Sequence, residues 1–390
     1  MFIERTLTNT LKKIINEFPV VALTGPRQSG KTTLVKHVFP DLKYVSLEDP
    51  DRREFAQTDP RGFLANCQNG VILDEVQRVP DLFSYIQGIV DAEKCPGQFI
   101  LTGSQHFLLH EKISQSLAGR VAFLTLLPLS LEELYKAGIP LTDENECMVK
   151  GFYPRLYDTS VNPHEWYANY LQTYVERDVR QIKNITDLSA FQRFVRLCAG
   201  RVGQLLNLSS LAHDCGITHN TARSWLSVLE ASFILFFLEP HHKNFNKRLV
   251  KMPKLYFYDT GLASALLGIN HASQLTTHPL RGNLFECLVV AELAKHQYHR
   301  GERPAYSFWR DKVGHEVDCV LEHGNAFIPI EIKSGRTITA DSFKGLAYWN
   351  TLTNGNPRRA YVVYAGDEYQ ERSDGTALGW RTVNDVFHTK

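Results

Sequence analysis

Short apolar runs alternate with longer polar or amphipathic stretches over the first third of the chain. The runs are rich in Val, Ile, Leu and Phe, and segments of helix length separate them. Because a strand covered by helices on both faces needs no polar face, this rhythm predicts a parallel sheet inside an α/β domain at residues 1–135. The runs span residues 20–23, 44–47, 71–73, 99–101 and 121–124.

Residues 136–187 lack this rhythm and predict a helical linker or lid. Aromatic side chains recur there at helix-like intervals, which favours a packed helix face over a platform for stacking bases. These aromatic residues are Trp166, Tyr167, Tyr170 and Tyr174.

Residues 188–280 predict a winged helix-turn-helix. A helix from Leu208 ends at a glycine turn at Gly216, and Thr218 is placed to cap a second helix. Two apolar runs near Phe233 and Leu255 then predict the strands of a wing.

Residues 281–390 predict a second α/β domain. An amphipathic helix at 284–293 precedes three strand-like runs at 306–309, 317–321 and 327–332. A further helix near Phe343 and a strand at 360–364 complete this core.

Composition limits the classes of partner and compartment. The chain has 390 residues, with 43 basic and 42 acidic side chains, so its bulk charge indicates neither a nucleic-acid nor a membrane surface. Seven scattered cysteines without a C-x-x-C pair are typical of a reducing compartment. The longest apolar stretch, at 233–238, is too short to span a bilayer. We therefore expect a soluble cytoplasmic protein without membrane contact.

A glycine-rich turn follows the first predicted strand and precedes a helix. This order lets backbone N–H groups surround phosphates at the positive end of the helix. The Lys31 ammonium would reach the β- and γ-phosphates, and the Thr32 hydroxyl would bind Mg²⁺. We therefore expect ATP and Mg²⁺ as ligands. The sequence has nothing that resembles the Asn-Lys-x-Asp motif with which GTPases recognise guanine. The phosphate-binding residues are Gly25, Pro26, Arg27, Gln28, Ser29, Gly30, Lys31, Thr32 and Thr33.

Further residues predict ATP hydrolysis in addition to binding. The strand at 71–73 ends in Asp74, a candidate for the metal shell, and Glu75, a candidate for polarising the attacking water. Ser104 follows the next strand and is a candidate γ-phosphate sensor. Arg120 is a candidate arginine finger for its own or a neighbouring subunit, which leaves a homo-oligomer open.

Residues 19–130 resemble the AAA-type ATPase module of the P-loop class. More narrowly, four phrases resemble a widespread prokaryotic family that joins this module to a C-terminal domain of formerly unknown function. The resemblance spans essentially the whole chain. It implies the domain architecture, whereas the cellular role of that family is largely unassigned. The phrases are GPRQSGKT at 25–32, LDEVQ at 73–77, LTGS at 101–104 and LLPLS at 126–130.

Carboxylates in the last domain predict a second chemical site. Asp318 lies in one strand, and a turn after it returns the chain as a strand with Glu331 and Lys333 on one face. The set resembles the PD-(D/E)xK restriction-endonuclease-like fold, which implies Asp318 and Glu331 as metal ligands and Lys333 as catalytic lysine. Glu286 on the preceding helix is a candidate fourth member, with Mg²⁺ or Mn²⁺ as the cation. Val317 stands where the fullest motif has proline, and a charged surface hairpin is the alternative.

Basic residues cluster in the predicted wing at 243–254. They could contact several DNA phosphates, whereas the second helix offers His219, Asn220 and Arg223 for base edges. The basic residues of the wing are Lys243, Lys247, Arg248, Lys251 and Lys254.

These patterns together favour an ATPase that couples nucleotide turnover to a DNA-binding, nuclease-like C-terminal half. Two alternatives stay open at this point. One is an ATP-operated switch whose C-terminal half binds a protein and cuts nothing, and the other is a winged-helix DNA-binding regulator.

Overall fold

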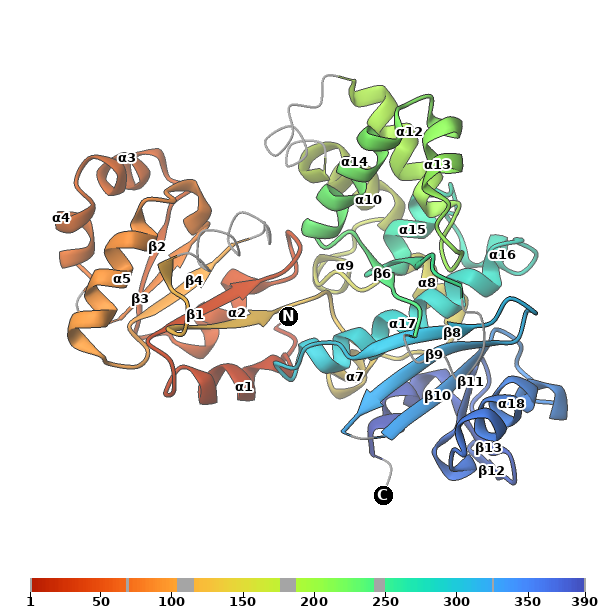
Figure 1. Ribbon diagram of the computed structural model, residues 1–390. Helices are drawn as coiled ribbons and strands as arrows, with labels where there is room; N and C mark the ends of the chain where they lie inside the picture. The colour runs from red at the N-terminus through yellow and green to blue at the C-terminus, as the bar shows by residue number, and fades with distance from the viewer. Residues whose placement is uncertain are drawn as a thin grey trace.

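The computed structural model describes residues 2–67, 70–103, 116–175, 187–241, 250–324 and 326–388. These residues form two lobes, and the N-terminus lies between them (Figure 1). The smaller lobe ends with strand β5, and the larger one contains the rest of the chain.

Five parallel strands form the sheet of the N-terminal lobe, in the order β2-β3-β4-β1-β5. All five apolar runs are strands, which confirms the predicted parallel sheet. Because the strands are parallel, their carboxyl ends meet at one edge. The strands are β1 (Val20–Thr24), β2 (Lys43–Ser46), β3 (Val71–Asp74), β4 (Phe99–Thr102) and β5 (Val121–Thr125).

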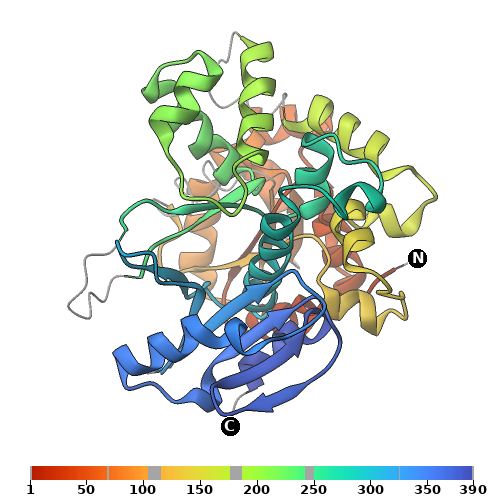
Figure 2. The same cartoon turned by 90° about the vertical axis from the view of Figure 1, so that its right-hand side faces the viewer.

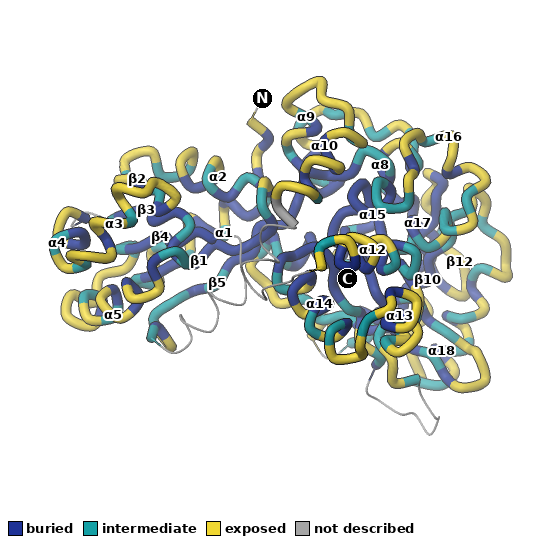
Figure 3. Tube along the Cα trace, turned by 90° about the horizontal axis from the view of Figure 1, so that it is seen from above, coloured by how far each residue is buried: buried dark blue, intermediate teal, exposed yellow. Residues whose placement is uncertain are grey.

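Helices cover both faces of this sheet. Leu11 and Leu34 bring α1 and α2 onto one face, while Phe63 and Phe83 bring α4 and α5 onto the other. Strands β1, β3 and β4 are buried along their whole length, edge strand β2 is partly exposed, and the outer sides of the helices are exposed (Figure 3). The helices are α1 (Leu7–Ile14), α2 (Lys31–Val38), α3 (Pro50–Thr58), α4 (Pro60–Ala65), the 3₁₀ turn η1 (Val76–Arg78) and α5 (Leu82–Glu93).

Short helices follow in the stretch predicted to be a linker or lid. Their apolar side chains belong to one core that continues into the C-terminal half, from Leu134 and Trp166 to Trp380. This stretch is therefore packed as part of the larger lobe. Its elements are α7 (Leu131–Lys136), α8 (Glu144–Lys150), α9 (Arg155–Asp158), α10 (Pro163–Tyr170) and the π-helical turn η2 (Leu171–Val175).

Three helices and a pair of antiparallel strands come next. The predicted turn is present, because Gly216 ends α13 at a φ of 73° and the Thr218 hydroxyl accepts a hydrogen bond from Thr221 N in α14. Leu205 also bridges to Lys254 at the edge of the strand pair. The elements are α12 (Leu188–Ala199), α13 (Leu208–Cys215), α14 (His219–Ala231), β6 (Leu235–Leu238), β7 (Lys254–Phe257), α15 (Thr260–Leu266) and α16 (Ala272–Leu275).

A six-stranded mixed sheet forms the last part of the chain, in the order β12-β13-β11-β10-β9-β8. The predicted helix and strands are present, and the short strands β12 and β13 extend them. The elements are α17 (Arg281–Tyr298), β8 (Tyr306–Arg310), β9 (Glu316–His323), β10 (Ala326–Lys333), η3 (Ala340–Phe343), α18 (Lys344–Thr353), η4 (Pro357–Arg359), β11 (Tyr361–Tyr364), β12 (Gln370–Arg372), β13 (Gly375–Gly379) and η5 (Trp380–His388).

Helix α17 runs through the middle of the larger lobe (Figure 2). It is buried on nearly all sides from Leu284 to Gln297, which is typical of a core helix. Among the described residues, no helix combines the length and the apolar character that a bilayer crossing requires.

Candidate functional site

The turn after β1 wraps closely around the end of β5. Gly25 has a φ of 143°, and a Cβ atom at this position would lie 2.1 Å from the Leu126 carbonyl oxygen. Only glycine fits such an approach. Gly30 then adopts a φ of 94° and caps the N-terminus of α2. The local backbone is thus that of a tight phosphate-binding turn at the carboxyl edge of the sheet.

Lys31 and Thr32 begin α2 inside this turn. The Lys31 ammonium donates to the Gly25 carbonyl at 2.9 Å and to the Pro26 carbonyl at 2.8 Å. The Thr32 hydroxyl donates to Asp74 Oδ2 at 3.0 Å. The two polar side chains expected at the phosphates and at the metal therefore lie at the start of one helix.

Asp74 joins the ends of three neighbouring elements. Besides Thr32, its carboxylate accepts hydrogen bonds from the Tyr44 hydroxyl at 2.6 Å and from the Thr102 hydroxyl. Burial and the Asp74 carboxylate raise the pKa of Tyr44, so its hydroxyl stays a donor. The sequence reasoning missed Tyr44, the second residue of β2, and Thr102, the last residue of β4.

Glu75 follows Asp74 in a left-handed conformation with a φ of 55°. This backbone conformation is uncommon for a residue other than glycine. Gln77 Nε2 donates to Glu75 Oε2 at 2.5 Å, which fixes the carboxylate. Burial raises the pKa of Glu75, which suits a group that accepts a proton from water.

A cavity of about 920 Å³ lies over the turn. The larger lobe contributes part of its wall, including Arg155 and Trp166, which the sequence reasoning did not assign to this site. Tyr170 of the same lobe donates to the Arg27 carbonyl at 3.4 Å. The lining residues are Phe2, Ile3, Arg5, Arg27, Gln28, Gly30, Lys31, Thr32, Thr33, Leu34, Glu48, Glu75, Leu129, Pro154, Arg155, Asp158, Val161 and Trp166.

Arg5 holds the phosphate-binding turn through backbone carbonyl groups. Its guanidinium donates to the Ser29 carbonyl at 2.7 Å and to the Leu127 carbonyl at 2.6 Å. Its Nε lies 3.1 Å from Glu133 Oε1 on α7. The N-terminal segment thus ties the phosphate-binding turn to the larger lobe, and no local motif in the sequence marks Arg5.

Two further candidates have different positions. Ser104 lies outside the described residues. Arg120 precedes β5 and pairs with Asp91 through Nε and Nη2. It lies at the amino edge of the sheet, a strand length of about 13 Å from the carboxyl edge that holds the turn. Arg120 therefore lies at the opposite edge of the sheet from the cavity over the turn of its own chain.

The second predicted set comes together between α17, β9 and β10. Asp318 Oδ2 accepts a hydrogen bond from Ile332 N at 2.8 Å, and Lys333 Nζ lies 2.6 Å from Glu331 Oε2. Burial and the Asp318 charge raise the pKa of Glu286 and of Glu331. The four predicted side chains are thus close enough to interact.

Lys254 occupies this cluster, a position that the sequence reasoning did not foresee. Its ammonium lies 2.9 Å from Glu286 Oε1, 2.6 Å from Glu316 Oε1 and 3.8 Å from Asp318 Oδ1. Because Lys254 is 4% exposed, the prediction that it lies on an open wing is wrong. Among the described residues, no set of three or more His, Cys, Asp and Glu side chains is arranged to hold a metal ion.

The remaining DNA candidates are partly described. His219, Asn220 and Arg223 are exposed on α14, and Lys251 is exposed before β7. Lys243, Lys247 and Arg248 lie outside the described residues.

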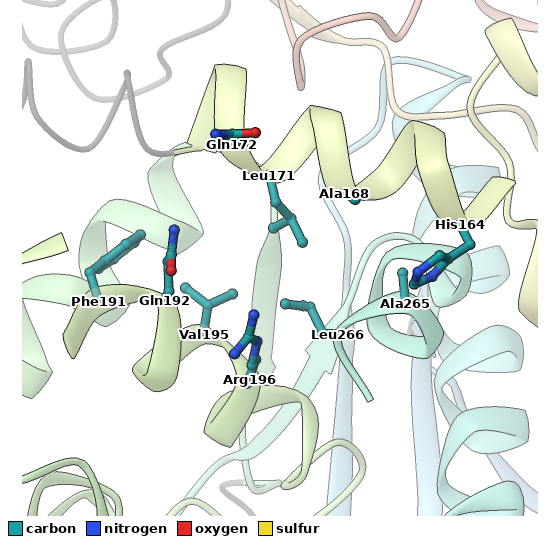
Figure 4. Close-up of a pocket in the computed structure, with 10 residues that line it drawn as sticks. All are labelled: His164, Ala168, Leu171, Gln172, Phe191, Gln192, Val195, Arg196, Ala265 and Leu266. Atoms are coloured by element: carbon teal, nitrogen blue, oxygen red, sulfur yellow. The ribbon is translucent and has the colours of Figure 1, made fainter. Parts of the chain in front are cut away.

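A smaller cavity of about 350 Å³ lies between α10, α12 and α15 (Figure 4). Leu171, Val195 and Leu266 give it an apolar wall, and His164 and Arg196 lie at its margin. It contains none of the residues predicted to be functional.

Family models match three parts of the chain. An AAA domain matches residues 17–135, which agrees with the predicted nucleotide-binding module. A domain of unknown function (DUF8612) matches residues 141–273, and another (DUF4143) matches residues 281–383.

Similar proteins cover most of the chain. A solved structure, the Walker-type ATPase PABY2304 of Pyrococcus abyssi, has 14% identity and a TM-score of 0.46, covering 68% of this chain and 96% of that one. The uncharacterized proteins Rv2008c of Mycobacterium tuberculosis and Mb2031c of Mycobacterium bovis are each 30% identical over 380 residues, 96% of this chain and 83% of theirs. The chain therefore belongs to the family of these two mycobacterial proteins, and it carries an AAA domain at residues 17–135.

Proposed function

We propose that the protein is a Mg²⁺-dependent ATPase that works as a switch between its two lobes. The observation that supports this most directly is the cavity over the phosphate-binding turn, because both lobes line it. A nucleotide in that cavity would contact Lys31 from the smaller lobe and Arg155 from the larger one. Its hydrolysis would then change the contacts between the lobes.

The residues at the turn fit a magnesium nucleotide. Thr32 and Asp74 offer hard oxygen ligands 3.0 Å apart, the donors that Mg²⁺ prefers. Bound Mg²⁺ would neutralise charge that develops on the β- and γ-phosphates. The Lys31 ammonium would exchange its two backbone carbonyl partners for phosphate oxygens.

Glu75 would orient and deprotonate the attacking water. Its carboxylate is held by Gln77, and its raised pKa favours uptake of a proton. Ser104 stays a candidate sensor, and Arg120 stays a candidate finger. Since Arg120 lies at the opposite edge of the sheet, it could act only on the nucleotide of a second copy, which would require a homo-oligomer.

Movement of the larger lobe on DNA is a second candidate activity. It is supported by α14, which presents His219, Asn220 and Arg223 to solvent after a Thr-capped turn. The Glu286, Asp318 and Glu331 set does not fit a metal ion while Lys254 lies among its carboxylates. We therefore favour, in place of a nuclease, a non-cleaving half that binds DNA or a protein in the cytoplasm.

Steady-state hydrolysis tests the ATPase. Lys31→Ala should abolish tight ATP binding, and Glu75→Gln should bind ATP and hydrolyse it about 100-fold or more slowly. Lys12→Ala, on an exposed residue of α1, is the control and should hydrolyse normally. Normal turnover in both site variants would rule the proposal out, and equal turnover of GTP would remove the preference for ATP.

Retention on DNA at rising salt tests the second candidate. If α14 contacts DNA, retention should weaken steeply with salt and fall further in Arg223→Ala. No retention on DNA at any salt concentration would instead favour a protein partner.

A further inference from the structure

We propose that the carboxylate cluster between α17, β9 and β10 is closed by the chain itself, with the Lys254 ammonium in the place of a divalent cation. The cluster then binds neither Mg²⁺ nor Mn²⁺ in the wild-type protein and cleaves no phosphodiester. This inference concerns the larger lobe and is independent of the nucleotide cavity.

The backbone of Lys254 is fixed by its neighbours. Lys254 is the first residue of β7, where it pairs with Leu238 of β6 and bridges to Leu205. Its side chain is 5% exposed and passes over the ring of Phe308, with Nζ 5.5 Å from the ring centroid. The ammonium is therefore contributed by strand β7, which precedes α17, β9 and β10 in the chain. The fold brings this strand to the cluster.

The Lys254 ammonium makes close contacts with carboxylates from two elements. It donates to Glu286 Oε1 of α17 at 2.9 Å, and it lies 2.6 Å from Glu316 Oε1 of β9. Although burial works to lower it, the charges of Glu286, Asp318 and Glu316 raise the pKa of Lys254 overall. Lys254 is thus a cation at neutral pH. Its ammonium is paired and hydrogen-bonded, which offsets the cost of burying its charge.

Further donors contact these carboxylates. Tyr256 donates to the same oxygen, Glu286 Oε1, at 2.5 Å, and Arg310 lies 3.3 Å from Glu316 Oε2. Glu331 pairs with Lys333 at 2.6 Å, while Asp318 accepts from Ile332 N. A divalent cation would have to displace these donors and meet the repulsion of an ammonium a few ångströms away.

The position of Glu331 is restricted from a further side. A Cβ atom at Gly345, in the first turn of α18, would lie 2.1 Å from Glu331 Oε1. Helix α18 therefore packs its glycine directly against this carboxylate, which keeps Glu331 beside Lys333. The cluster is consequently packed as well as linked by ion pairs, as a structural ion network is.

Removing the Lys254 ammonium should open a cation site. Lys254→Met keeps most of the length of the side chain but leaves Glu286, Glu316 and Asp318 without their shared cation. Buried carboxylates without a counter-charge recruit a cation or a proton. The variant should therefore acquire the metal affinity that the wild-type protein lacks.

The test is a Mn²⁺ titration of the full chain without nucleotide, followed by electron paramagnetic resonance. Wild type and Asp318→Asn should bind Mn²⁺ alike, since the cluster contributes nothing in either. Lys254→Met should bind at least about tenfold more tightly than wild type, and this gain should vanish in Lys254→Met with Asp318→Asn. Lys251→Met, on the exposed residue three positions earlier, is the matched control and should behave as wild type.

Two results would overturn the inference. One is Mn²⁺ binding or plasmid nicking by the wild-type protein that Asp318→Asn removes. The other is a folded Lys254→Met protein, shown by a wild-type circular dichroism spectrum, that gains no Mn²⁺ affinity. If Lys254→Met does not fold, the comparison of wild type with Asp318→Asn still decides the question.

Discussion

Arg5 and Glu133 form an ion pair in the interior, with Arg5 Nε 3.1 Å from Glu133 Oε1 and side chains that are 4% and 1% exposed. The pair lies between the phosphate-binding turn, through the Ser29 carbonyl, and the larger lobe, through the His299 ring 3.4 Å from Glu133. Although burial works against it, the charges of Arg5 and His299 lower the pKa of Glu133. A single buried carboxylate thus balances the charge of an arginine that supports the nucleotide site.

Loss of this carboxylate should destabilise the protein strongly. Glu133→Gln leaves the Arg5 guanidinium buried without a counter-charge, which should lower the free energy of unfolding by about 3 kcal/mol or more. The neighbouring Glu132 offers a control, because its pair with Lys136 lies near the surface and should contribute less than about 1 kcal/mol. Urea unfolding of Glu133→Gln and Glu132→Gln measures both, and equal effects would contradict the role of the pair.

A methyl group at Gly25 should abolish nucleotide binding. The Cβ of Gly25→Ala would collide with the Leu126 carbonyl, and its φ of 143° is strained for alanine, so the turn must move. Gly88→Ala in α5 is the control, since nothing lies within 4 Å of its added Cβ. We expect that control to bind a fluorescent ATP analogue normally and to be stabilised by about 0.5–1 kcal/mol. Wild-type affinity in Gly25→Ala would show that the turn can accommodate the shift.

Arg155 should contribute to ATP affinity from across the lobe boundary. It is exposed and lines the nucleotide cavity, so its charge can pair with phosphate. Arg155→Gln should weaken ATP binding about tenfold, and AMP binding less, because AMP carries fewer phosphate charges. Isothermal titration with ATP, ADP and AMP measures this dependence. A uniform loss for all three ligands would indicate a role in shaping the cavity, without phosphate contact.

Acid should weaken the larger lobe through His296. Burial, followed by the charge of Arg300, lowers the pKa of His296 to about 3, and its ring stacks on Phe387 at 4.0 Å. The folded protein therefore holds His296 neutral, whereas the unfolded chain takes up a proton near pH 6.5. Proton uptake by the unfolded chain therefore leaves the free energy of unfolding unchanged above about pH 6.5. As the pH falls below this value, it lowers the free energy of unfolding, by about 1 kcal/mol at pH 5.5.

His296→Phe keeps the stacked ring and removes the titration. The difference in unfolding free energy between pH 7.5 and pH 5.5 should be smaller in this variant than in wild type by about 1 kcal/mol. Denaturant unfolding at the two pH values measures it. An unchanged difference would mean that His296 accepts its proton in the folded state.

The elements of the nucleotide site could be predicted because its signals are local. Gly25 to Thr32 lie in one stretch, and the apolar runs around Val20 and Val71 specify strands by themselves. Asp74 was found because it directly follows such a run. In each of these cases, the residues that define the feature are neighbours in sequence.

The residues that could not be predicted have their partners far along the chain. Arg5 meets Leu127 across 122 positions, and Lys254 meets Glu286 across 32. Lys254 also lies in a stretch rich in basic residues, which made an exposed surface the natural interpretation. The burial of that one lysine depends on tertiary packing, which no local pattern encodes.

Helix α17 carries Glu286 near its start and is followed directly by His299, which contacts Glu133. These two contacts are 13 residues apart, so their directions around the helix axis are set by the number of residues between them. One residue inserted or deleted between them would turn the far end by about 100° and misalign one of the two contacts. Sequence drift in this family should therefore replace residues within α17 while leaving its length unchanged.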